Sequence, residues 1–215
     1  MKIQYTAIVL AAGKGARMHL DYNKMFYRLQ DGTTILEKSV NLFLADEDCV
    51  QVVLMTTREE ENFVRSLFDD ERMTYAYGGE TRQDSVYNGL QAVTSKYVMI
   101  HDGARCFLAM REIEALKEAL TQENACLLMV PAIDTIKEVK DGYVVHTPKR
   151  STLYAAQTPQ CFLTEIIRDC YAQADRDGFV ASDDAMLVEH YSCTPIKVVL
   201  GSYGNKKVTT KEDLE

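Results

Sequence analysis

Short, continuous apolar runs alternate along the chain with longer segments whose apolar residues recur at helical spacing. Continuous apolar character is typical of strands that are covered on both faces of a sheet. Because strands and helices alternate, we expect an α/β fold with a mostly parallel sheet. The predicted strands are residues 7–10, 50–56, 73–77, 97–101, 126–130 and 196–200. The predicted helices are residues 34–44, where Thr34 and Glu37 form a capping box, and residues 59–68, 85–93, 110–120, 163–174 and 183–191.

One region, at about residues 134–160, breaks this alternation. Residues 135–139 and 143–146 alternate polar and apolar positions on either side of Asp141-Gly142, which predicts a β-hairpin. An isolated hairpin is only marginally stable in water, so we expect a β-arm that packs against something, and a second copy of the chain is the simplest candidate. The alternative is an ordinary hairpin folded back onto its own sheet.

The composition fits a single domain, because 47% of the 215 residues are hydrophobic and can form a sizeable core. A net charge of −8 argues against a partner such as nucleic acid or an anionic membrane, since both require a basic face. We expect neither a signal peptide nor a membrane span, because no apolar run is long enough. The six cysteines form no C-x-x-C motif, which indicates buried free thiols in a reducing cytoplasm. The four histidines are isolated from one another, so we do not expect a zinc site.

Residues 7–24 combine a predicted strand with a loop of small residues and two cations. Gly13 and Gly15 allow the backbone to approach a ligand closely, and Arg17 and Lys24 follow them. The spacing differs from that of a P-loop, and the third glycine of a dinucleotide-binding fingerprint is absent. The combination favours a phosphate-binding loop over a turn that is merely structural.

Two further clusters follow predicted strands. Gly78 and Gly79 precede Ser85, a set that suits close contact with a base or ribose, although a simple turn and a helix cap are the alternatives. Asp102 ends a buried strand and is well placed to bind Mg²⁺, which takes one or two carboxylates and completes its shell with phosphates and water. The alternative for Asp102 is an ion pair with Arg105 that only ties the loop together.

The remaining polar clusters are Thr135, Arg150 and Thr158 on the expected arm, and residues 204–209 near the C-terminus. None of the clusters contains a plausible pair of nucleophile and base. Cations, one carboxylate and small loops are suited to transfer at phosphorus, where positioning and charge neutralisation carry most of the catalysis.

The order of motifs resembles one enzyme family over nearly the whole chain. The segments AAGKGARM, GGETRQDSV, HDGAR, KRSTLYAAQTPQ and KKVTTKEDL occur in this order. This set resembles the 2-C-methyl-D-erythritol 4-phosphate cytidylyltransferases of non-mevalonate isoprenoid synthesis. The resemblance implies a Rossmann-like nucleotidyltransferase domain, a homodimer interlocked through β-arms, CTP as nucleotide substrate and Mg²⁺ as metal.

The resemblance also implies roles for individual residues. Arg17 and Lys24 would neutralise charge on the CTP phosphates, Asp102 would hold the metal, and Arg150 and Lys207 would position the phosphate of methylerythritol phosphate. The residues expected to contact the nucleotide are Ala11, Ala12, Gly13, Gly15, Gly79, Ser85 and Ala104, while Arg105, Thr135 and Thr158 are expected to join the acceptor pocket, in part from the partner chain.

The chain departs from the family pattern at three positions, Asn23, Gly103 and Cys106, the last of which stands where a proline is usual after the arginine. Asn23 stands where the family commonly has proline, and because proline fixes φ, we expect the Lys24 loop to be less rigid. Gly103 replaces an alanine that is usual after the strand-end aspartate. Two alternative functions stay open at this point, a ribitol 5-phosphate cytidylyltransferase and a nucleotide-binding protein without catalysis.

Overall fold

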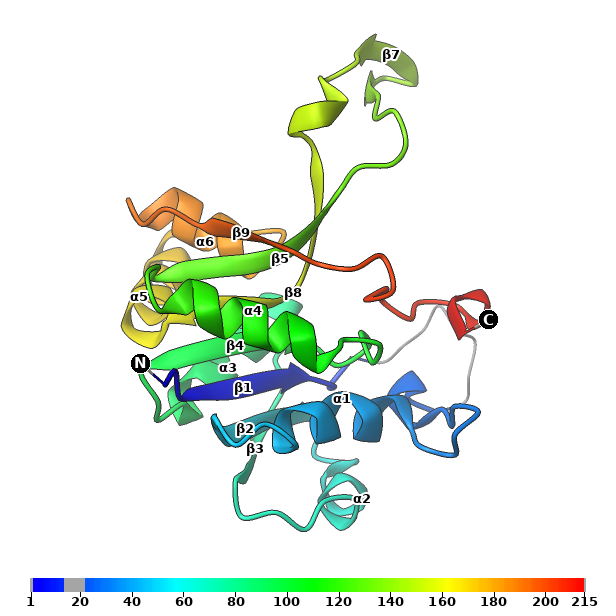
Figure 1. Cartoon of the computed structure of the whole chain (residues 1–215), viewed down its shortest axis with the longest axis vertical. Coiled ribbons are helices and arrows are strands. Elements are labelled where there is room, and N and C mark those ends of the chain that lie inside the picture. The colour runs from blue at the N-terminus through cyan, green and yellow to red at the C-terminus, as the bar shows by residue number, and fades with distance from the viewer. Residues whose placement is uncertain (1, 14–21, 215) are drawn as a thin grey trace.

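The computed structural model describes residues 2–13 and 22–214. Seven strands of these residues form one sheet: β1 Tyr5–Leu10, β2 Cys49–Thr56, β3 Met73–Tyr77, β4 Tyr97–Asp102, β5 Ala125–Pro131, β8 Tyr154–Leu163 and β9 Lys197–Leu200. Their order across the sheet is β3-β2-β1-β4-β8-β5-β9 (Figure 1). Neighbouring strands are parallel except at β8, which runs antiparallel to both β4 and β5. The expected mostly parallel α/β sheet is confirmed.

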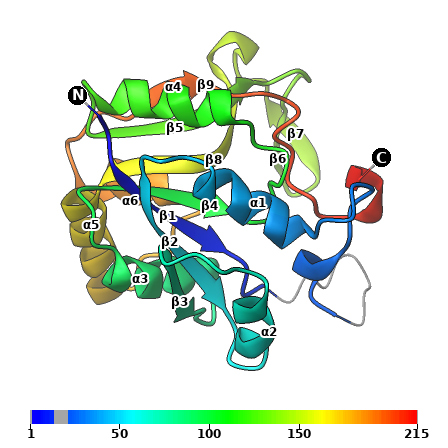
Figure 2. The same cartoon turned by 60° about the horizontal axis from the view of Figure 1, so that its bottom comes forward.

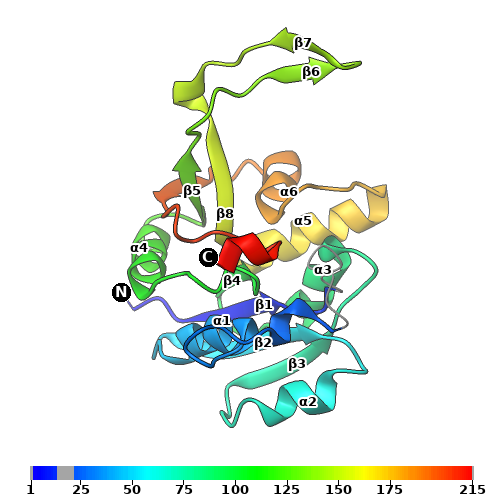
Figure 3. The ribbon, with the colours of Figure 1, turned by 90° about the vertical axis from the view of Figure 1, so that its right-hand side faces the viewer.

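Helices cover both faces of this sheet: α1 Ile35–Leu44, α2 Glu61–Ser66, α3 Arg82–Ala92, α4 Met110–Leu120, α5 Thr164–Asp177 and α6 Asp184–Tyr191. On one face, α1 and α4 pack against residues such as Val9, whereas α3, α5 and α6 pack on the other face against residues such as Ile8 (Figures 2 and 3). Burial of both faces explains why the parallel strands appear as continuous apolar runs. Within the described part of the chain, no helix has the length and apolarity needed to cross a membrane.

Two helix starts show how local sequence sets the boundaries. Thr34 accepts a hydrogen bond from the Glu37 N–H, and the Glu37 carboxylate accepts one from the Thr34 N–H, so the predicted capping box is confirmed. The helix predicted to start at Ser85 instead begins at Arg82, because Thr81 and Asp84 form a second capping box. The helix-cap alternative for Ser85 is therefore wrong.

Strand β8 has no counterpart among the predicted strands, and part of it lies in the segment expected to form the arm. Gln157, Thr158 and Gln160 are buried polar residues, and Pro159 supplies no N–H for pairing, so the segment lacks an apolar strand pattern. Partners far away in sequence satisfy these polar groups. One example is the Gln160 amide, which donates to the Asp183 carboxylate at 2.8 Å.

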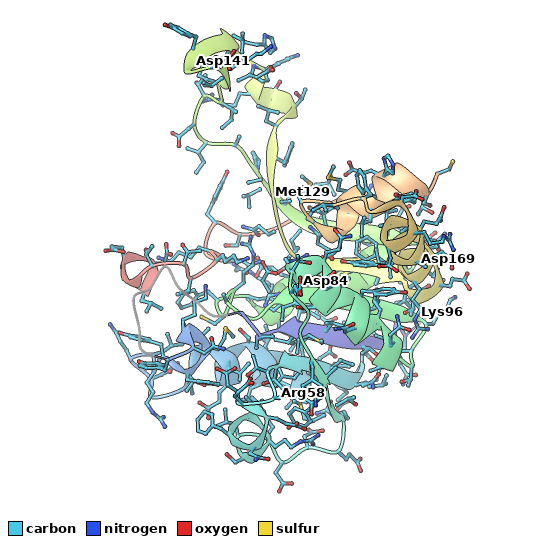
Figure 4. All side chains as sticks on the ribbon, turned by 180° about the vertical axis from the view of Figure 1, so that it is seen from behind. Arg58, Asp84, Lys96, Met129, Asp141 and Asp169 are labelled. Atoms are coloured by element: carbon cyan, nitrogen blue, oxygen red, sulfur yellow. The ribbon has the colours of Figure 1, made fainter. Side chains whose placement is uncertain are left out.

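The predicted hairpin is confirmed as β6 Glu138–Lys140 paired antiparallel with β7 Tyr143–His146. Asp141 and Gly142 have φ values of 51° and 83°, the left-handed conformation that a tight hairpin turn requires. The hairpin forms its own two-stranded sheet and projects away from the main sheet (Figure 3), with Asp141 at its outer end (Figure 4). Tyr143 is 78% exposed, and its apolar neighbours on the hairpin are exposed as well.

Candidate active site

A cavity of about 560 Å³ lies at the carboxyl ends of β1, β3 and β4. Loops after these strands meet there with the segment around Lys24 and with the C-terminal segment (Figure 2). Ligands of open α/β sheets bind at this edge. Of the residues that the sequence assigns to the site, those lining the cavity are Ala11, Ala12, Gly13, Lys24, Gly79, Ser85, Asp102, Ala104 and Lys207.

Several assigned residues are not part of this wall. Gly15 and Arg17 fall within residues 14–21, outside the described part of the chain. Thr135 and Arg150 lie in the exposed segments that flank the hairpin, where the Arg150 guanidinium donates to a backbone carbonyl at 3.0 Å. Their expected contribution to a partner's site stays a prediction.

Close packing of two loops forms one side of the cavity. A Cβ atom added at Gly78 would lie 2.5 Å from the Ala12 Cβ, so only glycine allows this approach without displacement. The Ser85 hydroxyl donates to the Thr81 carbonyl at 2.9 Å and accepts from the Gly79 N–H at 3.0 Å. Ser85 therefore fixes the shape of the loop after β3.

Lys24 begins a short 3₁₀ turn, η2 Lys24–Phe26, and its ammonium donates to the Val208 carbonyl at 2.7 Å. Asn23 caps this turn by accepting from the Met25 N–H at 3.1 Å. The Asn23 amide also donates to the Ala11 carbonyl at 3.0 Å and to the Glu60 carboxylate at 3.1 Å. These bonds restrain the segment where the family commonly has proline, and the φ of Asn23, −62°, is the value that proline adopts.

Two cations hold the carboxylate of Asp102. Arg82 Nε donates to Oδ1 at 3.0 Å, and Lys207 Nζ donates to Oδ2 at 2.6 Å. Burial opposes ionisation of Asp102, but the charges of Arg82 and Lys207 outweigh it and hold its pKa well below the usual range. Asp102 is therefore an anion at neutral pH. The alternative partner, Arg105, does not bond to this carboxylate.

Arg82 is a cavity residue to which the sequence reasoning gave no role. Its Nη1 and Nη2 donate to Oδ1 and Oδ2 of Asp184 at 3.1 and 2.8 Å. Asp184 is fully buried and also accepts from the Tyr171 hydroxyl. Burial acts to lower the pKa of Arg82, but the charges of Asp184 and Asp102 raise it. Arg82 stands in the quoted motif GGETRQDSV, yet nothing in the sequence pairs it with Asp184, which lies about 100 residues further along the chain.

Thr158 and Arg105 support the cavity from behind. The Thr158 hydroxyl accepts from the Asp102 N–H at 3.0 Å, and its carbonyl accepts from the Asn205 amide at 3.0 Å. Arg105 Nη1 donates to the Asn205 carbonyl at 2.8 Å. Since Asn205 precedes Lys207 by two residues, these bonds fix the loop that carries the lysine.

Asp102 meets the main requirement for a magnesium ligand, an ionised carboxylate on the cavity wall. Among the described residues, no cluster of three or more histidine, cysteine or acidic side chains could hold a metal by itself. One carboxylate completed by phosphates and water is a usual Mg²⁺ arrangement. Because Oδ1 and Oδ2 each already accept a hydrogen bond from a cation, an arriving ion would compete with Arg82 and Lys207 for Asp102.

A mostly parallel sheet covered on both faces, with small loops and cations at its carboxyl edge, defines the class of α/β proteins that bind phosphorylated ligands such as nucleotides. The model of the family described as 2-C-methyl-D-erythritol 4-phosphate cytidylyltransferase matches residues 5–215. The chain belongs to this family.

Individual relatives agree with this assignment. The 2-C-methyl-D-erythritol 4-phosphate cytidylyltransferase of Geobacillus thermodenitrificans is 42% identical, with 99% of this chain and 94% of that protein covered. The protein of the same name from Clostridioides difficile is 40% identical, with 98% and 90% covered. Among solved structures, the 4-diphosphocytidyl-2C-methyl-D-erythritol synthase of Anaerococcus prevotii is 30% identical with a TM-score of 0.89, and 100% of this chain and 96% of that chain are covered.

Proposed function

We propose that the protein transfers the cytidylyl group of CTP to 2-C-methyl-D-erythritol 4-phosphate, releasing pyrophosphate. The observation that supports this proposal best is the cavity at the carboxyl edge of the sheet, which is lined by Lys24 and by an ionised carboxylate, Asp102, that bonds Arg82 and Lys207. Membership of the family supplies the two substrates. The product would be 4-diphosphocytidyl-2-C-methyl-D-erythritol, an isoprenoid precursor of the non-mevalonate pathway.

In this reaction a phosphate oxygen of the acceptor attacks the α-phosphorus of CTP. A new P–O bond forms, the bond between the α-phosphorus and the bridging oxygen breaks, and pyrophosphate leaves with the electron pair. The attacking oxygen is already anionic at neutral pH, so no general base is needed. The main obstacle is repulsion between two polyanions, which fixed cations reduce.

The residues would divide this work according to their position. Lys24 and Arg17 would stabilise charge on the CTP phosphates, and Lys207 would hold the acceptor phosphate. The backbone of Ala11, Ala12 and Gly13 would face the phosphates, and Gly79, Ser85 and Ala104 would face the nucleoside. Asp102 would hold Mg²⁺, which when bound supplies neutralisation of charge on the phosphates.

We also propose that the hairpin arm forms a homodimer and completes the acceptor pocket of the partner with Arg150 and Thr135. Exposed apolar residues on a projecting hairpin support this, because such a surface is stabilised by burial against another chain. Val144→Asp on the hairpin, where Val144 is 62% exposed, should give a monomer in sedimentation experiments and lose turnover. Val180→Asp, at a site 79% exposed on the main body, is the matched control and should remain dimeric.

We infer a cytoplasmic location, and the thiols support this inference. All six cysteines are free and five are buried, which suits a reducing cytoplasm, where we place the enzyme.

Pyrophosphate release by the purified protein tests the proposed reaction. CTP with 2-C-methyl-D-erythritol 4-phosphate and Mg²⁺ should release pyrophosphate, whereas CTP alone should not. Release only with ribitol 5-phosphate would replace the proposed acceptor. Binding of CTP without release in the presence of either polyol phosphate would instead support a nucleotide-binding protein without catalysis.

A further inference from the structure

Asp184 is a fully buried carboxylate that does not line the cavity, yet it contacts a residue that does. It accepts from both terminal nitrogens of Arg82, at 3.1 and 2.8 Å. These two hydrogen bonds hold the Arg82 guanidinium in a position from which its Nε donates to Oδ1 of Asp102 at 3.0 Å. The second oxygen, Oδ2, bonds Lys207 instead.

The two cations on Asp102 therefore differ in how firmly they are held. Arg82 is anchored by the buried Asp184, which lies at the start of α6 and also accepts from the Tyr171 hydroxyl. Among the described residues, the Lys207 ammonium makes a hydrogen bond only to Asp102, so displacing it breaks one bond, whereas Arg82 makes two further bonds, both to Asp184. Oδ1 therefore bonds the more firmly held cation, and Oδ2 bonds the cation that is easier to displace.

We propose that Asp184 is a positioning residue: by binding both terminal nitrogens of Arg82, it limits this arginine to one bond with Asp102 and leaves Oδ2 paired with Lys207 alone, so that the divalent cation that arrives with CTP has one bond to displace there. This inference rests on the proposed function, because it assumes that metal and nucleotide bind together. An arginine freed from Asp184 can pair side-on with both oxygens of Asp102, as arginine and carboxylate commonly do. Oδ2 would then carry a second charge-assisted hydrogen bond beside that of Lys207.

Asp184→Asn tests this idea because the amide keeps the shape of the side chain and removes its charge. The quantity to measure by calorimetry is the ratio of CTP affinities with and without Mg²⁺. We expect this ratio to fall about tenfold, the equivalent of one charge-assisted hydrogen bond that the ion must displace. Affinity for CTP without Mg²⁺ should stay within about twofold. Half-saturating Mg²⁺ in turnover should rise by a similar factor.

The double variant Asp184→Asn with Arg82→Gln separates positioning from a structural role. Without Arg82 only Lys207 competes for Oδ2, as in the wild type, so the Mg²⁺ effect on CTP affinity should return towards the wild-type value. The double variant also removes both partners of a buried ion pair, so it tests the idea even if the single variant does not fold.

Two matched controls complete the set. Tyr171→Phe removes the hydroxyl that contacts Asp184 but keeps the ion pair, and Asp177→Asn removes a surface carboxylate that accepts from the Tyr191 hydroxyl at 3.0 Å. Both should change the ratio less than about twofold.

A folded Asp184→Asn protein with an unchanged ratio would overturn the inference, as would a double variant no better than the single one. The binding ratio requires no polyol phosphate. A wild-type protein that binds CTP with Mg²⁺ but does not release pyrophosphate would refute the proposed function and leave this comparison valid.

Discussion

Asn23 offers a sharp test of how the chain holds Lys24 without the proline that is common in its family. The side chain makes three hydrogen bonds, to the Ala11 carbonyl, to the Glu60 carboxylate and from the Met25 N–H. Asn23→Ala removes all of them. Asn23→Pro also removes them but retains the backbone conformation, because φ is −62° and ψ is 125° at this position.

The magnitudes follow from these contacts. Asn23 is only 8% exposed and Ala11 only 5%, so the alanine variant leaves the Ala11 carbonyl buried without its donor, at about 1–3 kcal/mol. Loss of the cap adds about 1 kcal/mol. We expect Asn23→Ala to lower the free energy of unfolding by about 3 kcal/mol. Asn23→Pro should recover about 1 kcal/mol of this, because proline restricts the unfolded chain.

Denaturant unfolding of the variants measures these differences, and pyrophosphate release measures their effect on Lys24. Asn88→Ala is the matched control, since the exposed Asn88 amide also donates to a backbone carbonyl, that of Tyr77, at 3.1 Å. Exposed sites of this kind usually change stability by less than about 0.5 kcal/mol. An Asn23→Ala protein as stable as the Asn88→Ala protein would refute the reasoning, and so would a proline variant less stable than the alanine variant.

Three further outcomes are expected. Lys24→Ala should lower kcat/KM for CTP by about 10²–10³-fold, because a charge at ~4 Å is worth roughly 4 kcal/mol before desolvation, and turnover near the wild-type rate would exclude its role. At pH 8 a thiol reagent should rapidly modify one thiol per native protein, that of the exposed Cys193, and no thiol after Cys193→Ser. The buried thiols should react slowly, since burial raises the pKa of Cys106, for example, to about 11. Rapid modification of a second thiol would contradict the fold. Burial lowers the pKa of His101 from 6.5 to about 4, so as the pH falls the histidine is protonated in the unfolded chain before it is protonated in the folded protein. The free energy of unfolding should therefore fall by about 2 kcal/mol between pH 7 and pH 5. His101→Gln should remove this loss, and denaturant unfolding at both pH values measures it.

The sheet could be predicted where burial alone decides the residues. In β1, Ile8 and Val9 face opposite helix layers, so both must be apolar and the run stands out in the sequence. In β8, Thr158 and Gln160 are buried too, but their polar atoms bond Asp102 and Asp183. Hydrogen bonds to distant residues replace apolar character there, and a local pattern does not contain that information.

The candidate site divides in the same way. Glycine loops and strand-end carboxylates can be recognised from the local sequence. The order of the motifs along the chain, which resembles that of the family, added Lys24 and Lys207 to the predicted site. The ion pair of Asp184 with Arg82 has no local sequence signal, because it forms only where the starts of α3 and α6 come together in the folded protein. The rigidity of the Lys24 segment could not be predicted either. The absence of the family's proline suggests a more flexible loop, whereas the three hydrogen bonds of the Asn23 side chain restrain it.

The position of β8 also determines the order in which the chain can fold. Among the described strands, β8 alone joins β4 to β5, so the sheet is two separate pieces until residues 154–163 insert between them. On a ribosome, β1 to β4 can pair as soon as they emerge, but β4 keeps an unpaired edge, and β5 has no partner strand, until about 60 residues after β4 have been made. Insertion of one antiparallel strand late in synthesis is therefore the expected slow step of folding, and the stage at which a nascent chain most needs protection from aggregation.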